Sequence, residues 1–172
     1  MIVYITGASG SGKTTLLKSL SVKGYDLDDI YENNWKKHKT IDTVQKGVIK
    51  DVNILLSKNK NTIFVGLQGK DTLPFTPDVV YILIRKEYEQ YYRDKLVRDL
   101  NLLCKYKNDF EEVLKKAPFE EFRNHFWSND IVTMKSFDEF KKYVDKINKS
   151  IQKDFPSSEM LTASEILKKI NK

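Results

Sequence analysis

The chain has 172 residues, of which 40% are hydrophobic, and a single cysteine, Cys104. This length and apolar content predict one globular domain with a substantial core, and a single cysteine excludes an internal disulfide. No apolar run approaches the roughly 20 residues that a membrane-spanning helix needs, so we expect a cytoplasmic protein without a membrane partner. The net charge of +6 fits either a polyanionic partner or anionic nucleotide substrates.

The first predicted elements are a short apolar strand at residues 2–5 and a glycine-rich segment directly after it. Residues 7–14 read Gly-Ala-Ser-Gly-Ser-Gly-Lys-Thr, which fits the phosphate-binding pattern G-x-x-x-x-G-K-[ST], the P-loop. Leucines then recur at helical spacing and predict a helix to about Val22. The pattern indicates a phosphate-binding loop specifically when it stands between a strand and a helix, as it does here.

A P-loop implies ATP as a ligand, because its glycines let several backbone N–H groups converge on phosphate at a helix N-terminus. Lys13 is the candidate catalytic cation that reaches the β- and γ-phosphates, and the Thr14 hydroxyl is a candidate Mg²⁺ ligand. The residues expected to bind the nucleotide are Gly7, Ser9, Gly10, Ser11, Gly12, Lys13, Thr14 and Thr15.

The next predicted strand, at residues 25–29, ends in the acids Asp26, Asp28 and Asp29. Mg²⁺ bound to ATP takes a carboxylate besides Thr14, and the later apolar strands carry no acid at their ends. One carboxylate of this turn is therefore expected to hold the metal and another to orient an acceptor hydroxyl. The spacing alone does not say whether Asp26 or Asp28 holds the metal.

The remaining pattern alternates between strands and helices. A polar link follows the acidic turn, and a closing helix begins at Ser136. The other predicted elements are a helix at 41–56, strands at 62–66, 79–84 and 130–134, a charged helical stretch at 86–117, and a short helix that begins at Thr162. This alternation predicts an α/β fold: a three-layer, doubly wound, parallel five-stranded sheet of the P-loop NTPase type.

The basic residues are distributed unevenly. Seven lysines and two aspartates lie between Lys36 and Lys60, whereas the four arginines all lie between Arg85 and Arg123. A guanidinium binds phosphate with two parallel hydrogen bonds, which an ammonium cannot do. The arginine-containing segment is therefore a candidate phosphate-binding region.

With these motifs the chain resembles the small P-loop kinases of the adenylate-kinase and shikimate-kinase-like group, over about residues 1–152. Asp26-Leu27-Asp28 resembles the D-x-D of shikimate-kinase-like members, in which the first acid works with Mg²⁺ and the second binds the acceptor hydroxyl. Residues 85–127 resemble the lid region, so the resemblance implies that Arg93 and Arg98 act near the adenine and the phosphates as catalytic residues.

The resemblance implies a single kinase domain over residues 1–172, with a helical lid at about 85–127 and an appended C-terminal helix at about 157–172. The chain departs from the family pattern after its third strand, where it reads Gly66-Leu67-Gln68-Gly69. It also has no arginine between residues 23 and 84, where a monophosphate acceptor would favour several.

We therefore predict an ATP-dependent kinase that moves the γ-phosphate to a small acceptor, with a nucleoside or nucleotide favoured, in a monomer or homodimer. One alternative is a polynucleotide 5′-hydroxyl kinase that uses the lysines of residues 36–60; it is disfavoured because that stretch has no aromatic platform beyond Tyr31 and Trp35. Another alternative is a nucleotide-binding switch or assembly module without an acceptor.

Overall fold

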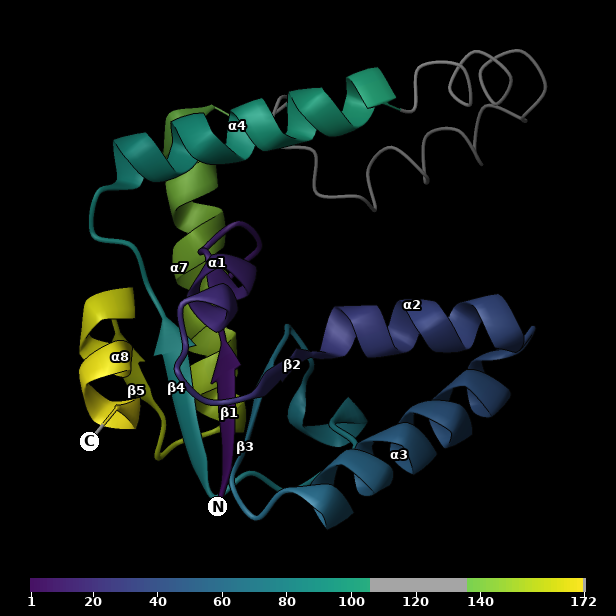
Figure 1. The fold of residues 1–172 in the computed structure, drawn as a ribbon. Coiled ribbons are helices and arrows are strands. Elements are labelled where there is room, and N and C mark those ends of the chain that lie inside the picture. The colour runs from purple at the N-terminus through teal and green to yellow at the C-terminus, as the bar shows by residue number, and fades with distance from the viewer. Residues whose placement is uncertain (106–135, 172) are drawn as a thin grey trace, which may run out of the picture. The chain divides into compact units, whose positions relative to one another are not determined.

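The computed structural model describes residues 1–105 and 136–171 (Figure 1). The chain divides into two compact units, the first formed by Met1–Lys86 with Asp145–Lys172 and the second by Glu87–Val144. The predicted strand at 130–134, residues 106–127 of the predicted lid and Arg123 lie outside the described residues.

The first unit is built on a five-stranded sheet in which every neighbouring pair is parallel. Its strands are β1 (Ile2–Thr6), β2 (Gly24–Asp26), β3 (Thr62–Val65), β4 (Val79–Leu83) and β5 (Glu159–Leu161), in the spatial order β2-β3-β1-β4-β5. The predicted parallel five-stranded α/β sheet is thus confirmed, and β1 occupies its centre. The fifth described strand lies in the segment where the sequence predicted only a C-terminal helix, and that helix, α8 (Ala163–Ile170), is correspondingly shorter.

Side chains of the three central strands alternate between two apolar layers, as the period of a β-strand requires. Val3, Ile5 and Val65 pack with residues of α1 (Lys13–Lys18) and α8 on one face. On the other face, Tyr4 and Phe64 pack with apolar residues of α3 (Ile41–Lys58) and of the last turns of α7 (Phe137–Asp154). Sheet and helices therefore form the predicted three layers.

After the P-loop, the observed elements differ from the predicted ones. Helix α1 ends at Lys18 rather than near Val22, and Gly24 begins β2 rather than ending the helix. The predicted polar link is a helix, α2 (Leu27–Lys37), because the Asp26 side chain accepts the Asp28 N–H at 3.0 Å and caps its first turn. Asp28 and Asp29 consequently lie on a helix and not on a strand.

The second unit contains α4 (Tyr88–Lys105) and the first turns of α7. Tyr91 packs edge-on against Phe140 with ring centroids 5.1 Å apart, and the Ser136 and Glu139 side chains cap α7 as the sequence predicted. In the described parts of both units, no helix has the length and apolar content to cross a membrane.

Candidate functional site: a phosphate loop beside an acidic turn

The P-loop occupies the turn between β1 and α1, at the carboxyl end of the central strand. Gly7, Gly10 and Gly12 have φ angles of 143°, 80° and 102°, which side chains of L-residues rarely allow. A Cβ on Gly7 would lie 2.5 Å from the Leu83 carbonyl oxygen, so β4 leaves no room for a side chain there. This backbone is the concave form that gathers N–H groups around an anion.

The Lys13 ammonium group folds back over this loop. Its Nζ donates to the Gly7 carbonyl oxygen at 2.7 Å and to the Ala8 carbonyl oxygen at 3.2 Å. The lysine is half-buried, and its charge lies close enough to Asp28 to affect the pKa of that carboxyl. The predicted catalytic cation is thus positioned on the loop that the sequence assigned to phosphate.

The structure brings Thr14 and Asp26 together, the two predicted metal ligands. The Thr14 hydroxyl donates to Asp26 Oδ2 at 3.0 Å, while Asp26 Oδ1 accepts the Asp28 N–H. The strand register explains this contact: Asp26 pairs with Val65 and Val65 pairs with Ile5, so the β2 end lies level with the β1 end. The described residues hold no group of three His, Cys, Asp or Glu side chains suited to a metal. A hydroxyl and one carboxylate nevertheless fit Mg²⁺, which takes most of its oxygen ligands from phosphate and water.

Asp28 lies in the first turn of α2, beside this pair. The side chain is solvent-accessible, but partial burial of its carboxyl and the nearby charge of Asp26 raise its pKa, against an opposing effect of Lys13. A carboxyl with a raised pKa beside a phosphate loop is typical of an acid–base group.

Sequence reasoning missed a tyrosine that fixes the loop after β3. Tyr4 is fully buried; its hydroxyl accepts the Gln68 N–H at 2.7 Å and donates to the Gln68 carbonyl oxygen at 3.2 Å. Burial raises the pKa of Tyr4 to about 12, and the charge of Asp28 acts in the same direction. A tyrosine in an otherwise aliphatic predicted strand is the one signal that could have pointed to it.

Tyr31 forms a second link to the same segment from α2. Its hydroxyl donates at 3.2 Å to the carbonyl oxygen of Thr72, in the short 3₁₀ helix η1 (Lys70–Thr72). Because Asp28 and Tyr31 are three residues apart on a helix, they share one face, and both influence the pKa of Tyr4. Asp28 and Tyr31 of α2 and the segment from Gln68 to Thr72 are therefore linked by hydrogen bonds and charge, with the buried Tyr4 holding Gln68.

The predicted lid arginines, Arg93 and Arg98, both lie on α4 in the second unit. An Arg98 guanidinium nitrogen lies 3.4 Å from Asp99 Oδ1, and the Asp99 carboxylate also accepts Lys95 Nζ at 2.7 Å. Lys95 is only 1% exposed, so its ion pair with Asp99 lies in the interior of the second unit. The catalytic roles of both arginines stay predictions.

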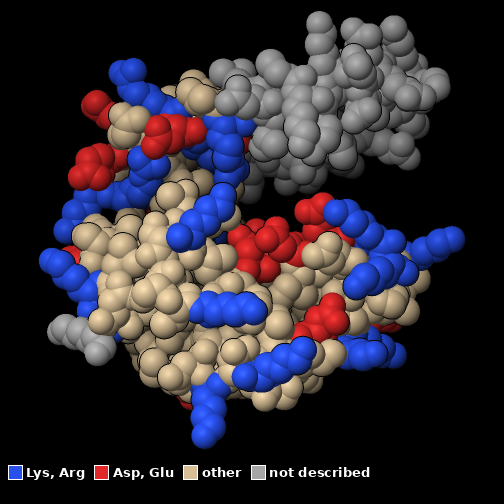
Figure 2. Space-filling view, viewed as in Figure 1, with Lys and Arg blue, Asp and Glu red and all other residues tan. Residues whose placement is uncertain are grey.

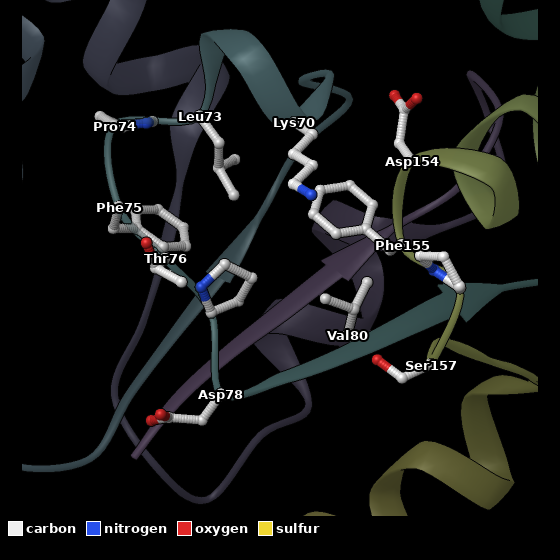
Figure 3. Close-up of a pocket in the computed structure, with 12 residues that line it drawn as sticks. Lys70, Leu73, Pro74, Phe75, Thr76, Asp78, Val80, Asp154, Phe155 and Ser157 are labelled. Carbon is white, nitrogen blue, oxygen red and sulfur yellow. The ribbon is translucent and has the colours of Figure 1, made fainter.

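The first unit also contains a cavity of about 520 Å³ (Figure 3), and two of its lining residues, Phe75 and Phe155, pack edge-on against the Tyr4 ring. It lies between the segment that leads into β4 and the end of α7, and its lining includes Lys70, Phe75, Asp78, Asp154 and Phe155. None of the predicted site residues lines it. Asp78 precedes β4, whereas the P-loop follows the carboxyl end of β1.

Searches of protein-family models and of curated proteins find no match for this chain. Among solved structures, it is similar to shikimate kinase from Bacteroides thetaiotaomicron, with a TM-score of 0.52 and 15% sequence identity over 95% of this chain and 86% of that chain. The chain has the P-loop kinase fold. The resemblance predicted from the glycine loop and the acidic turn is thereby confirmed at the level of the fold.

Proposed function

We propose that the chain is an ATP-dependent phosphotransferase that moves the γ-phosphoryl group of ATP to a small acceptor, with a nucleoside or nucleotide favoured. The observation that carries this proposal is the 3.0 Å contact between the Thr14 hydroxyl and Asp26. This contact joins helix α1, which follows the phosphate loop, to the turn that carries Asp28. A nucleotide-binding switch also holds Mg²⁺ with a P-loop hydroxyl and one carboxylate, so the feature that favours a kinase is the second carboxylate, Asp28, beside this pair.

In this proposal the triphosphate binds to the backbone and side chains of the P-loop, with Lys13 on the β- and γ-phosphates. Thr14 and Asp26 hold Mg²⁺, which supplies positive charge to the phosphate oxygens when it is bound. The contacts of Lys13 with the Gly7 and Ala8 carbonyl oxygens support this role, because they keep the ammonium group over the loop.

Asp28 accepts the proton of the acceptor hydroxyl as the reaction proceeds. The bond between the acceptor oxygen and the γ-phosphorus forms while the bond between that phosphorus and the β,γ-bridging oxygen breaks. ADP leaves with the electron pair of the broken bond, and the hydroxyl proton is transferred to the carboxylate. The raised pKa of Asp28 supports this role, because a higher pKa lies closer to the pH at which the carboxyl must exchange a proton.

The similarity to a structure named as a shikimate kinase supports the reaction type, because that protein is named as a kinase. The acceptor of this chain is a separate question, since a shared fold does not fix the substrate. Arg93 and Arg98 complete the proposal as cations that act on the transferring phosphate.

The proposal is tested with the Lys13→Ala variant and a matched control, Lys18→Ala, which removes an exposed lysine from the same helix. We expect Lys13→Ala to lower phosphoryl transfer by at least about 100-fold with little change in melting temperature, because it removes a preorganised charge from the transferring group. The control should retain activity. Radiolabelled ATP with a panel of nucleosides and nucleotides provides the measurement, and equal activity of the two variants would contradict the assignment.

A further inference from the structure

The connection between β3 and β4 lacks the helix that usually covers the sheet in a crossover between parallel strands. Residues 66–78 contain only the short 3₁₀ helix η1, after which the chain returns to the start of β4 through Pro74 and Pro77. The cavity of about 520 Å³ lies between this connection and the end of α7 (Figure 3). Its volume is in the range of sites that bind small molecules.

The apolar walls of the cavity are held in place by packing. The rings of Phe75 and Phe155 both pack edge-on against the Tyr4 ring, with centroids 6.0 Å and 5.9 Å from it. The lining also includes Pro74, Pro77 and Pro156, whose rings fix the backbone φ angle. Because these walls are ordered before a ligand arrives, an apolar group that enters between them loses little free energy to the ordering of the site.

Three charged side chains line the cavity, and only one of them has a partner among the described residues. Asp78 Oδ2 accepts the Ile2 N–H at 2.6 Å. Lys70 and Asp154 form no side-chain hydrogen bond or ion pair, with each other or with another described residue. The Asp154 carboxylate lies near the residue before Lys70, since a Cβ on Gly69 would be 3.7 Å from Oδ2. Figure 3 shows Lys70 and Asp154 together at the top of the view and Asp78 at the bottom.

We propose that this cavity, which no P-loop residue lines, binds a free α-amino acid with an apolar side chain. The Cα of such a ligand carries a carboxylate and an ammonium group, so both charges lie at one end of the molecule and the side chain lies at the other. The carboxylate pairs with Lys70, the ammonium pairs with Asp154, and the side chain packs between the aromatic walls. A ligand with a single charge leaves one of the two protein groups without a partner.

The experiment measures the Kd of L-phenylalanine and L-leucine for the whole chain by isothermal titration calorimetry. Three analogues each remove one feature of phenylalanine: phenethylamine lacks the carboxylate, 3-phenylpropionate lacks the ammonium, and glycine lacks the apolar side chain. We expect the Kd of L-phenylalanine to be at least about tenfold lower than that of each analogue. Because salt screens both ion pairs, this Kd should rise between low and high salt. ATP should not compete.

Two variants assign the charged groups of the ligand to their partners. Lys70→Gln should weaken binding of L-phenylalanine and 3-phenylpropionate by about five- to tenfold and leave phenethylamine unchanged. Asp154→Asn should weaken binding of L-phenylalanine and phenethylamine and leave 3-phenylpropionate unchanged. The control for the lysine is Lys153→Gln, an exposed neighbour on α7 outside the lining.

The control for the carboxylate is Asp29→Asn, an exposed acid in the first turn of α2. Figure 2 shows acidic side chains gathered over this end of the helix, where an ammonium ligand could be attracted without entering the cavity. Both control variants should bind L-phenylalanine as the wild-type protein does. Melting temperatures of the four variants verify that each one is folded.

Three results would overturn the inference. The first is no heat of binding for either amino acid at about 10 mM. The second is equal affinity for L-phenylalanine and for both of its single-charge analogues. The third is binding that Asp29→Asn weakens and Asp154→Asn does not, which would place the ligand at the acidic turn. None of these results bears on the proposed kinase function, because the measurement does not use phosphoryl transfer.

Discussion

At the scale of single residues, Asp26 and Asp28 are two positions apart but have different surroundings. Asp26 accepts hydrogen bonds from the Thr14 hydroxyl and from a backbone N–H, so its charge is held in place by the protein. Asp28 is solvent-accessible and has a raised pKa. The first environment suits a group held in a fixed position beside a metal, and the second suits a group that exchanges a proton.

We expect the Asn variants of these two residues to differ in kind. Asp26→Asn should raise the Mg²⁺ concentration needed for half-maximal activity by about tenfold, because it removes a negative charge beside Thr14. Asp28→Asn should lower kcat by at least about 100-fold while ATP affinity stays near wild type, because it removes a proton acceptor. Steady-state kinetics over a Mg²⁺ titration distinguish the two, and similar small effects of both variants would favour a merely structural acidic turn.

The raised pKa of Asp28 also predicts a pH dependence. Asp28 is active when ionised, so activity should fall as the pH falls through its pKa, at a higher pH than for an ordinary aspartate. Because the charge of Asp26 is one cause of the shift, Asp26→Asn at saturating Mg²⁺ should move this acid limb to lower pH. The pH profiles of kcat for the wild-type protein and for Asp26→Asn check the direction of this shift. An unchanged acid limb in the variant would show that a group other than Asp28 titrates.

Tyr4 acts on the acceptor only through its neighbours, so we regard it as a positioning residue. Tyr4→Phe removes the hydroxyl that both accepts from and donates to Gln68, and should cost about 1–3 kcal/mol of stability. It should raise KM for the acceptor while KM for ATP stays constant. Tyr25→Phe is the control, because the Tyr25 hydroxyl accepts only a long 3.4 Å hydrogen bond from Asn59 among the contacts described for it. Equal rises in both KM values would indicate general loosening of the fold.

At the scale of elements, α2 and α3 are joined by a buried polar contact. Asn34 is 2% exposed, and its Nδ2 donates to the Ile30 carbonyl oxygen and, at 2.9 Å, to Asp51 of α3. Gly47 lies directly opposite: a Cβ at this position would collide with the Asn34 side-chain oxygen. The close approach of the two helices holds α2, and with it Asp28, in a fixed position.

Gly47→Ala tests this contact. In an exposed helix the change stabilises by about 1 kcal/mol, but here we expect a net loss of about 1–3 kcal/mol, because the buried Asn34 amide must move. In an Asn34→Ala background the closest contact is absent and only the His38 side chain, with Nε2 3.0 Å from the added Cβ, must move, so the same substitution should cost less. Denaturant unfolding of the four proteins gives the coupling energy, and additive effects would contradict the close packing.

Much of the fold could be predicted because the central strands are uniformly apolar and the P-loop motif fixes the turn after β1. Helix α2 was missed because only Leu27 and Asn34 are buried along its length, so no apolar stripe marks it in the sequence. The three-residue strand β5 was missed because it is short and begins with the exposed Glu159. The carboxylates of the site were found from residue type, but the link between Tyr4 and Gln68 spans 64 positions and leaves no local pattern.

At the scale of the whole molecule, the residues assigned to the reaction come from both compact units. Lys13, Asp26 and Asp28 belong to the first unit, and Arg93 and Arg98 belong to the second. The roles of the two arginines rest on the sequence, and substitution tests them.

We therefore expect Arg93→Ala and Arg98→Ala to lower kcat by about tenfold or more, and the corresponding Lys variants to rescue only part of it, because an ammonium lacks the planar fork. Lys141→Ala, which removes an exposed lysine from the second unit, should have little effect. Single-turnover rates at saturating ATP provide the measurement. Complete rescue by lysine at both positions would show that charge alone suffices.

The order of strands in the sheet has a consequence for the protein while it is being synthesised. A nascent chain that has emerged through Tyr31 already contains every residue assigned to the reaction in the first unit. It cannot arrange them, because β2 pairs with β3 and not with β1, so Asp26 reaches Thr14 only after Thr62–Val65 has inserted between the two strands. Closing such a long loop is entropically costly and slow relative to local helix formation. The ribosome-bound chain should therefore be unable to form the Thr14–Asp26 pair that would hold Mg²⁺ until β3 has left the exit tunnel, although its glycine motif emerges earlier.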